Sequence, residues 1–185
     1  KSNSEEFILN SNFSGNSKMI SFIDMSLYND NTLLDADVVF DFPSEKKNSQ
    51  IKINFKELNS SSYELENIYP GIFGSVLPTS LKSIGNFKFY GDLLYNNDKI
   101  KSNFQLDSNG GEIYSDLEIF DFINIDNASY VGTFKGLNVD LSNFITLPFL
   151  GKSTFAFTID GKGFIPELLN SQLTGKIQEL DINNY

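Results

Sequence analysis

Residues that could perform chemistry are few in this sequence. There is no histidine, cysteine or arginine, so the usual general base, the thiol nucleophile and the common transition-metal ligands are missing. Carboxylates remain, because a pair of Asp or Glu residues is sufficient for glycosidase chemistry. The candidates are Asp35, Asp37, Asp41, Asp116 and Glu118. They lie beside apolar residues in strand-like runs, as on the solvated face of a half-buried strand, and we predict that the chain is not an enzyme.

Cofactor and metal motifs are equally weak. A calcium site would need an Asp-x-Asp-x-Asp-Gly loop, and the Asn-Asp-Asn segment at 29–31 is better explained as a turn. The glycines at 161 and 163 do not fit the Gly-x-Gly-x-x-Gly pattern of a loop that opens a helix. We therefore expect neither a metal nor a cofactor.

Composition excludes several kinds of partner. The 185 residues include 14 basic and 24 acidic side chains, which gives a formal net charge of -10. Nucleic acids and anionic membrane surfaces are recognised through basic side chains, so neither is an expected partner. No apolar run approaches the roughly 20 residues that a membrane-spanning helix needs, and no signal segment opens the chain. We interpret both ends as cuts within a longer polypeptide.

The elements that must carry any site are strands. Apolar and polar residues alternate with period two at 50–56 and 100–106, as in half-buried strands. Similar runs lie at 7–13, 19–28, 34–42, 87–90, 112–122, 129–134, 155–159 and 173–182. Turn-forming residues at 29–31, 96–98 and 109–111 predict antiparallel hairpins. Short helices are possible at 62–68 and 139–145, each before a proline.

The chain also repeats itself. Triplets ending in glycine at 13–15, 89–91 and 159–161 are interpreted as strand ends, and Leu-Pro pairs precede the second and third of them. These features divide one continuous repetitive β segment, 1–185, into units of four or five strands, roughly 7–76, 77–146 and a partial 147–185. Stacked units of this kind form an elongated body. With so little helix to cover it, the apolar face must meet a second sheet, close on itself or shelter an apolar ligand.

Several segments of the second half resemble the TamB family. They are Phe-Lys-Gly-Leu-Asn-Val-Asp-Leu at 134–141, Leu-Pro at 147–148, Phe-Thr-Ile-Asp-Gly-Lys-Gly-Phe at 157–164 and Gly-Lys-Ile at 175–177. TamB proteins are translocation and assembly module components of Gram-negative envelopes, related to AsmA-like and bridge-like lipid-transfer proteins. The richness in Asn, Lys, Ile and Phe is similar to the Bacteroidota branch.

The resemblance implies an all-β fold of repeated antiparallel strands curled into a U-shaped, taco-like trough, as a fragment of a longer protein. It implies a periplasmic location, an inner-membrane anchor outside this fragment and an outer-membrane assembly barrel of the BamA superfamily as partner. The cargo would be phospholipid acyl chains, or strands of outer-membrane proteins. The residues that would line the groove are Ile51, Ile53, Phe55, Phe87, Phe89, Ile100, Phe104, Leu106, Ile113, Leu117, Ile119, Phe134, Phe155, Phe157 and Ile159.

Other interpretations stay open at this point. In a closed β-sandwich, such as a structural or surface adhesion domain, the same phenylalanines would form a dry core. A membrane-spanning barrel is disfavoured because it needs strands of about 9–11 residues with aromatic girdles, and most runs here are shorter. A carboxylate enzyme rests on the abundance of Asp and Glu alone.

Overall fold

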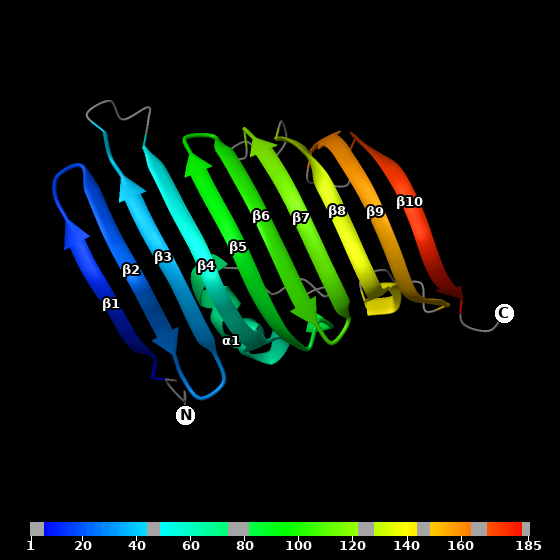
Figure 1. The fold of residues 1–185 in the computed structure, drawn as a ribbon, viewed down its shortest axis with the longest axis horizontal. Helices are drawn as coiled ribbons and strands as arrows, with labels where there is room; N and C mark the ends of the chain where they lie inside the picture. The colour runs from blue at the N-terminus through cyan, green and yellow to red at the C-terminus, as the bar shows by residue number, and fades with distance from the viewer. Residues whose placement is uncertain are drawn as a thin grey trace.

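The computed structural model describes residues 6–43, 49–73, 82–121, 128–143, 149–163 and 170–182. In these ranges ten strands form one antiparallel sheet, and their order in the sheet is their order in the sequence (Figure 1). The predicted all-β class and its antiparallel hairpins are confirmed. The strands are β1 Ile8–Gly15, β2 Met19–Tyr28, β3 Leu33–Asp41, β4 Gln50–Ser61, β5 Asn86–Asn96, β6 Lys99–Ser108, β7 Gly111–Phe120, β8 Ser129–Asp140, β9 Leu150–Lys162 and β10 Asn170–Ile182.

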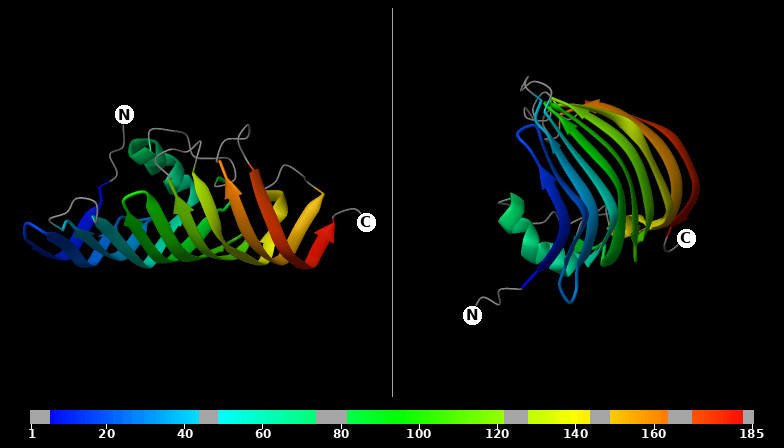
Figure 2. Two further views of the ribbon diagram at one scale, coloured as in Figure 1. Left: turned by 90° about the horizontal axis from the view of Figure 1, so that it is seen from above. Right: turned by 60° about the vertical axis from the view of Figure 1, so that its left-hand side comes forward.

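The sheet is curled and open. Its concave side carries the helix α1, Ser62–Phe73 (Figure 2). The strands β1 and β10 lie at opposite ends of the sheet and do not pair with each other. All ten described strands belong to this single sheet, so the two packed layers of the sandwich interpretation are not found among them.

Several strands are longer than their apolar runs suggested. The run at 87–90 was expected to end at Gly91, but β5 continues to Asn96. Gly91 breaks the apolar alternation, yet its backbone still pairs with Phe55 on one side and Phe104 on the other. The expectation that each anchor glycine ends a strand is therefore wrong for Gly91. The three anchor triplets lie in β1, β5 and β9, which are four strands apart.

Bulges lie near the middle of several strands in both halves of the sheet. In the first half of the sheet the register shifts at Phe22/Met25, between β2 and β3, and at Phe55/Leu58, between β4 and β5. In the second half it shifts at Gly136/Val139, between β8 and β9. The pairing from β5 through β8 is unbroken. Because a bulge bends its strand and increases the local twist, these bulges contribute to the curl in both halves of the sheet.

Helical structure differs from the expectation at two places. The helix α1 extends to Phe73 instead of ending at residue 68, before Pro70. It begins with a hydrogen bond from the backbone N–H of Glu64 to Oγ of Ser61, an N-cap that satisfies one backbone donor of the first turn. The second expected helix is reduced to a 3₁₀ turn, η2 Leu141–Asn143, because residues 139 and 140 belong to β8. Residues 144 and 145 lie outside the described ranges. None of the described helices is long and apolar enough to cross a membrane.

Candidate apolar binding groove

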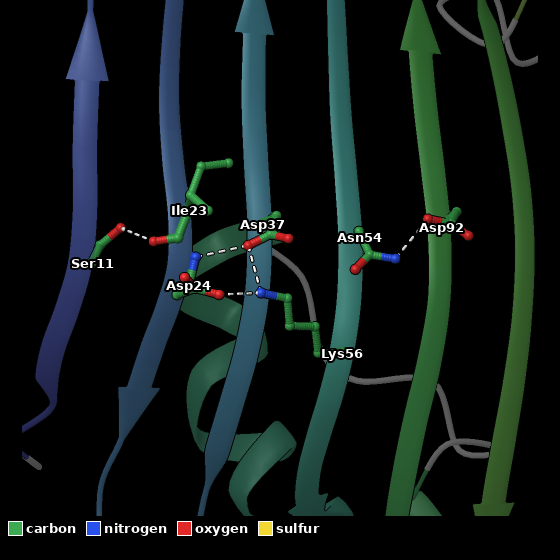
Figure 3. A network of polar contacts seen from close by, with 7 residues as sticks. All are labelled: Ser11, Ile23, Asp24, Asp37, Asn54, Lys56 and Asp92. Atoms are coloured by element: carbon green, nitrogen blue, oxygen red, sulfur yellow. Dashed lines mark hydrogen bonds and ion pairs between the residues drawn. The ribbon is translucent and has the colours of Figure 1, made fainter.

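The strand register places the two faces of the sheet unambiguously. Ile53 on β4 is opposite Leu93, and the same row continues through Ser102, Leu117 and, on β8, Gly132. Neighbouring positions along each strand point to the other face. Figure 3 views that other face, with polar residues of β3 and β4 in front of the sheet and α1 behind it. The row of Ile53 therefore lies on the concave side, which carries α1.

All fifteen residues predicted to line a groove lie on this concave face. Their shared position follows from the pairing of β4 through β9 and from the alternation within each strand. They are Ile51, Ile53 and Phe55 on β4, Phe87 and Phe89 on β5, Ile100, Phe104 and Leu106 on β6, Ile113, Leu117 and Ile119 on β7, Phe134 on β8, and Phe155, Phe157 and Ile159 on β9. That they bind a ligand stays a prediction.

A hollow of about 600 Å³ lies on this face between β6 and β10. Six predicted residues line it, namely Phe104, Leu106, Ile113, Phe134, Phe155 and Phe157. The prediction missed the rest of the lining, which consists of Ile84, Leu141, Leu150, Ser153, Leu173, Ile177 and Leu180. Leu173 and Ile177 could have been found from their alternation in the run at 173–182. Ile84 and Leu141 lie just outside strands, where no periodicity marks them.

The hollow offers almost no polar group to a ligand. Ser153 is the one non-apolar residue in its lining, and its hydroxyl donates a 2.9 Å hydrogen bond to the backbone carbonyl of Glu179. None of the lining residues is charged. A bound molecule would therefore be held here by its hydrocarbon part, through the hydrophobic effect.

The concave face is apolar but poorly covered. Large side chains on it keep much of their surface in solvent, for example Phe13 at 65% and Leu173 at 62% exposure. The apolar residues that are buried in the described ranges are Ala36, Ile84, Phe87, Ala128, Tyr130 and Val139. Exposed apolar side chains gathered on one face make it a candidate contact surface for a ligand or a partner.

Aromatic rings follow one another across the strands of this face. The ring centroids of Phe55 and Phe89 are 5.2 Å apart, and those of Phe89 and Phe104 are 5.4 Å apart. At the first end of the sheet, Phe13 and Phe22 make a similar contact at 5.3 Å. These spacings are within the range of favourable aromatic pairs. The apolar surface thus crosses the sheet from strand to strand instead of running along one strand.

The candidate catalytic carboxylates lie on the opposite, convex face. In cross-strand register the row reads Asp37, Asn54, Asp92, Asn103 and Asp116, so an asparagine separates each aspartate from the next. The Nδ2 atom of Asn54 donates a 2.8 Å hydrogen bond to Asp92. Because no two aspartates of this row are directly opposite each other, like charges are kept apart. This arrangement fits a solvated polar face.

Of the remaining candidate carboxylates, Glu118 pairs with lysines. Glu118 accepts hydrogen bonds from Lys99 at 2.8 Å and from Lys101 at 3.2 Å, and these lower its pKa. Asp41 is the last residue of β3, opposite Met19, and Asp35 is opposite Glu57. Within the described ranges no three acidic side chains come close enough to hold a metal ion.

A three-residue network joins the bulged strands on the convex face (Figure 3). Lys56 on β4 contacts Asp37 on β3 at 2.8 Å and Asp24 on β2 at 2.6 Å. The backbone N–H of Asp24, a residue with a φ of 51°, donates a 2.7 Å hydrogen bond to Asp37. The hydrogen bond from Lys56, followed by that from Asp24, lowers the pKa of Asp37, and the two carboxylates raise the pKa of Lys56.

Comparison with protein family models, with curated proteins and with solved structures found no match.

Proposed function

We propose that this chain is a segment of an envelope protein that shields apolar cargo in a curved trough. The cargo is the acyl chains of phospholipids, with strands of outer-membrane proteins as a second possibility of the same apolar kind. The observation that carries the proposal is the concave face, where half-buried phenylalanine side chains and the exposed Leu173, Ile177 and Leu180 of β10 line a hollow of about 600 Å³. A ligand that covers this surface removes apolar area from water, and ligand pockets typically have volumes of about 300–1,000 Å³.

The wider setting of the proposal follows from the resemblance to the TamB family. In that setting the trough lies in the periplasm of a Gram-negative bacterium, in a protein anchored in the inner membrane. Its partner is an outer-membrane assembly barrel of the BamA superfamily. The polar convex face, with its aspartate, asparagine and lysine side chains, keeps such a trough soluble in an aqueous compartment.

The test compares two substitutions that add the same charge on opposite faces of β9, and a third on the concave face of β6. Phe157 lines the hollow, whereas the next residue, Thr158, points to the convex face and pairs with Thr133 and Thr174. The chain is purified from a Gram-negative host, and bound lipid is measured by native mass spectrometry and lipid extraction. Wild type and Thr158→Asp should carry phospholipid. Phe157→Asp and Phe104→Asp should lose it and keep the far-ultraviolet circular dichroism of a β protein.

The two structural alternatives give different results. In an open trough the new carboxylate of Phe157→Asp faces water when no cargo is bound, so the fold tolerates it. In a dry core the same charge would be buried without a partner, at a cost of several kcal/mol, and the protein would unfold. A wild-type protein without lipid, or a Phe157→Asp variant that still carries lipid, would remove the support for the proposed function.

A further inference from the structure

Gly136, on the concave face, is covered by an aromatic ring, as is Gly161, where an added Cβ would lie 2.7 Å from Cε2 of Tyr130. Gly136 on β8 is directly opposite Phe155 on β9. A Cβ atom added to Gly136 would lie 2.5 Å from Cζ and 2.6 Å from Cε1 of Phe155, distances at which real atoms do not coexist. The ring therefore lies over the backbone of β8 in the space that a side chain would otherwise occupy.

Most other glycines of the sheet have a different reason to be small. At Gly91, Gly132 and Gly175 an added Cβ would lie within 2.2 Å of a backbone carbonyl oxygen on the neighbouring strand. No side-chain movement can relieve such a contact. At Gly136 the nearest atoms belong to side chains, those of Phe155 and, at 2.9 Å, Val139. The space above Gly136 is therefore defined by the position of a ring, and a ring can move.

The direction in which the Phe155 ring can move is limited. Its row on the concave face reads Ile113, Gly136, Phe155 and, on β10, Ile177. Ile113 and Ile177 belong to the lining of the hollow, as does Phe157, whose ring centroid is 5.1 Å from that of Phe155. Backbone lies below the ring and side chains lie on both sides of it. A ring that is displaced from Gly136 must rise into the hollow.

We propose that Gly136 sets the depth of the apolar hollow by letting the Phe155 ring lie flat on its floor. This inference rests on the proposed function. Gly136 and Phe155 together determine how much hydrocarbon the trough can bind between β6 and β10. A methyl group at position 136 raises the ring and fills the hollow from below. Shortening residue 155 removes the closer obstruction, leaves only Cγ2 of Val139 at 2.9 Å from the methyl group, and reopens the hollow.

The test measures binding of a single-chain apolar probe, dansyl-labelled undecanoic acid, by its fluorescence on titration with the full chain. Gly136→Ala should bind the probe about tenfold more weakly than wild type, the equivalent of about 1.4 kcal/mol. The double variant Gly136→Ala/Phe155→Leu should recover most of the lost affinity. Gly15→Ala is the matched control, because an added Cβ there meets its nearest neighbours at 3.5 Å, an ordinary contact. It should bind as wild type does.

The outcomes separate this inference from the proposed function. A wild-type chain that does not bind the probe overturns the proposed function, and the inference with it. If wild type binds and a folded Gly136→Ala variant binds equally well, the inference alone fails. It fails as well if Gly136→Ala loses binding and the substitution of Phe155 does not restore it, since the loss then comes from distortion of the sheet.

Discussion

The Nζ atom of Lys56 on β4 lies 2.6 Å from Oδ1 of Asp24 on β2, so this ion pair reaches across β3, the strand between them. Asp37 on β3 lies beneath the bridge and accepts hydrogen bonds from both partners. Asp24 and Lys56 are both extra residues at bulges. The network therefore fixes three strands to one another at the line along which the sheet bends.

Replacing Lys56 by methionine should raise the pKa of Asp37 toward its ordinary value of 3.8. A carboxylate whose pKa is lowered by folding stabilises the protein above its unfolded pKa, and this contribution is lost as the pH falls through the lowered value. Lys56→Met should therefore be less stable than wild type above the ordinary pKa of Asp37, and the difference should shrink as the pH falls below it. Carboxyl NMR titration of Asp37 measures the shift. Lys52→Met, on the same face of β4, should leave the pKa of Asp37 closer to that of wild type.

Two phenylalanines of the concave face should differ strongly in their effect on stability. Phe87 is 6% exposed, whereas Phe13 is 65% exposed. Phe87→Ala should lower the free energy of unfolding by about 3–5 kcal/mol, as for a buried aromatic residue. Phe13→Ala should lower it by about 1 kcal/mol, mainly through its contact with Phe22. Urea denaturation compares the two variants, and equal losses would contradict the description of this face as buried near β5 and open at β1.

Asn138 is strained by its place at the bulge of β8. Its φ is 51°, in the left-handed region, and its backbone N–H donates a 3.3 Å hydrogen bond to Oγ1 of Thr154. Glycine adopts this conformation without a steric cost, and a β-branched residue is a clear outlier there. Asn138→Gly should be neutral or stabilising by up to about 1 kcal/mol, and Asn138→Val should destabilise by about 1–2 kcal/mol. Thermal unfolding measures both variants. A midpoint for Asn138→Val at or above that of Asn138→Gly would contradict the left-handed conformation at this bulge.

The N-cap of α1 can be tested separately from the sheet. Ser61→Ala removes the oxygen that accepts the hydrogen bond from the backbone N–H of Glu64 and should cost about 1 kcal/mol of helix stability. Amide hydrogen exchange in the first turn of α1 should become faster, with the exchange in β6 to β9 unchanged. Ser62→Ala, one position later, is the control. Equal exchange in both variants would mean that Ser61 does not act as the cap.

Period-two alternation was sufficient to predict the strands and their apolar face, because adjacent side chains of a strand point to opposite sides. It failed where the bulges change the phase. Phe55 and Leu58 are three residues apart, yet the register places both on the concave face, since two residues of β4 oppose one residue of β5 at that point. A pattern of strict alternation assigns them to opposite faces. Gly91 misled the prediction for a related reason, since it interrupts the apolar run without ending the strand.

The walls of the hollow were harder to predict than its floor. Phe104 and Phe134 come from strands with strong alternation, whereas Ile84, Leu141 and Leu150 lie at or just outside strand ends. Alternation within a strand does not place residues at or beyond its ends, so no local pattern in the sequence marks these three. The Leu-Pro pairs at 77–78 and 147–148, which marked the repeat boundaries, lie outside the described residues.

Each strand of the described sheet pairs only with the strands directly before and after it in the sequence. Removing β6 and β7 together would therefore leave β5 next to β8 with the correct direction and with both apolar faces on the same side. Inserting a two-stranded hairpin would likewise keep the strand directions and the apolar face. Only pairing between strands that are neighbours in the sequence would change. In such an architecture the length of the molecule can change by two strands at a time through duplication or deletion. Its reach can thus be adjusted over evolution independently of its cross-section.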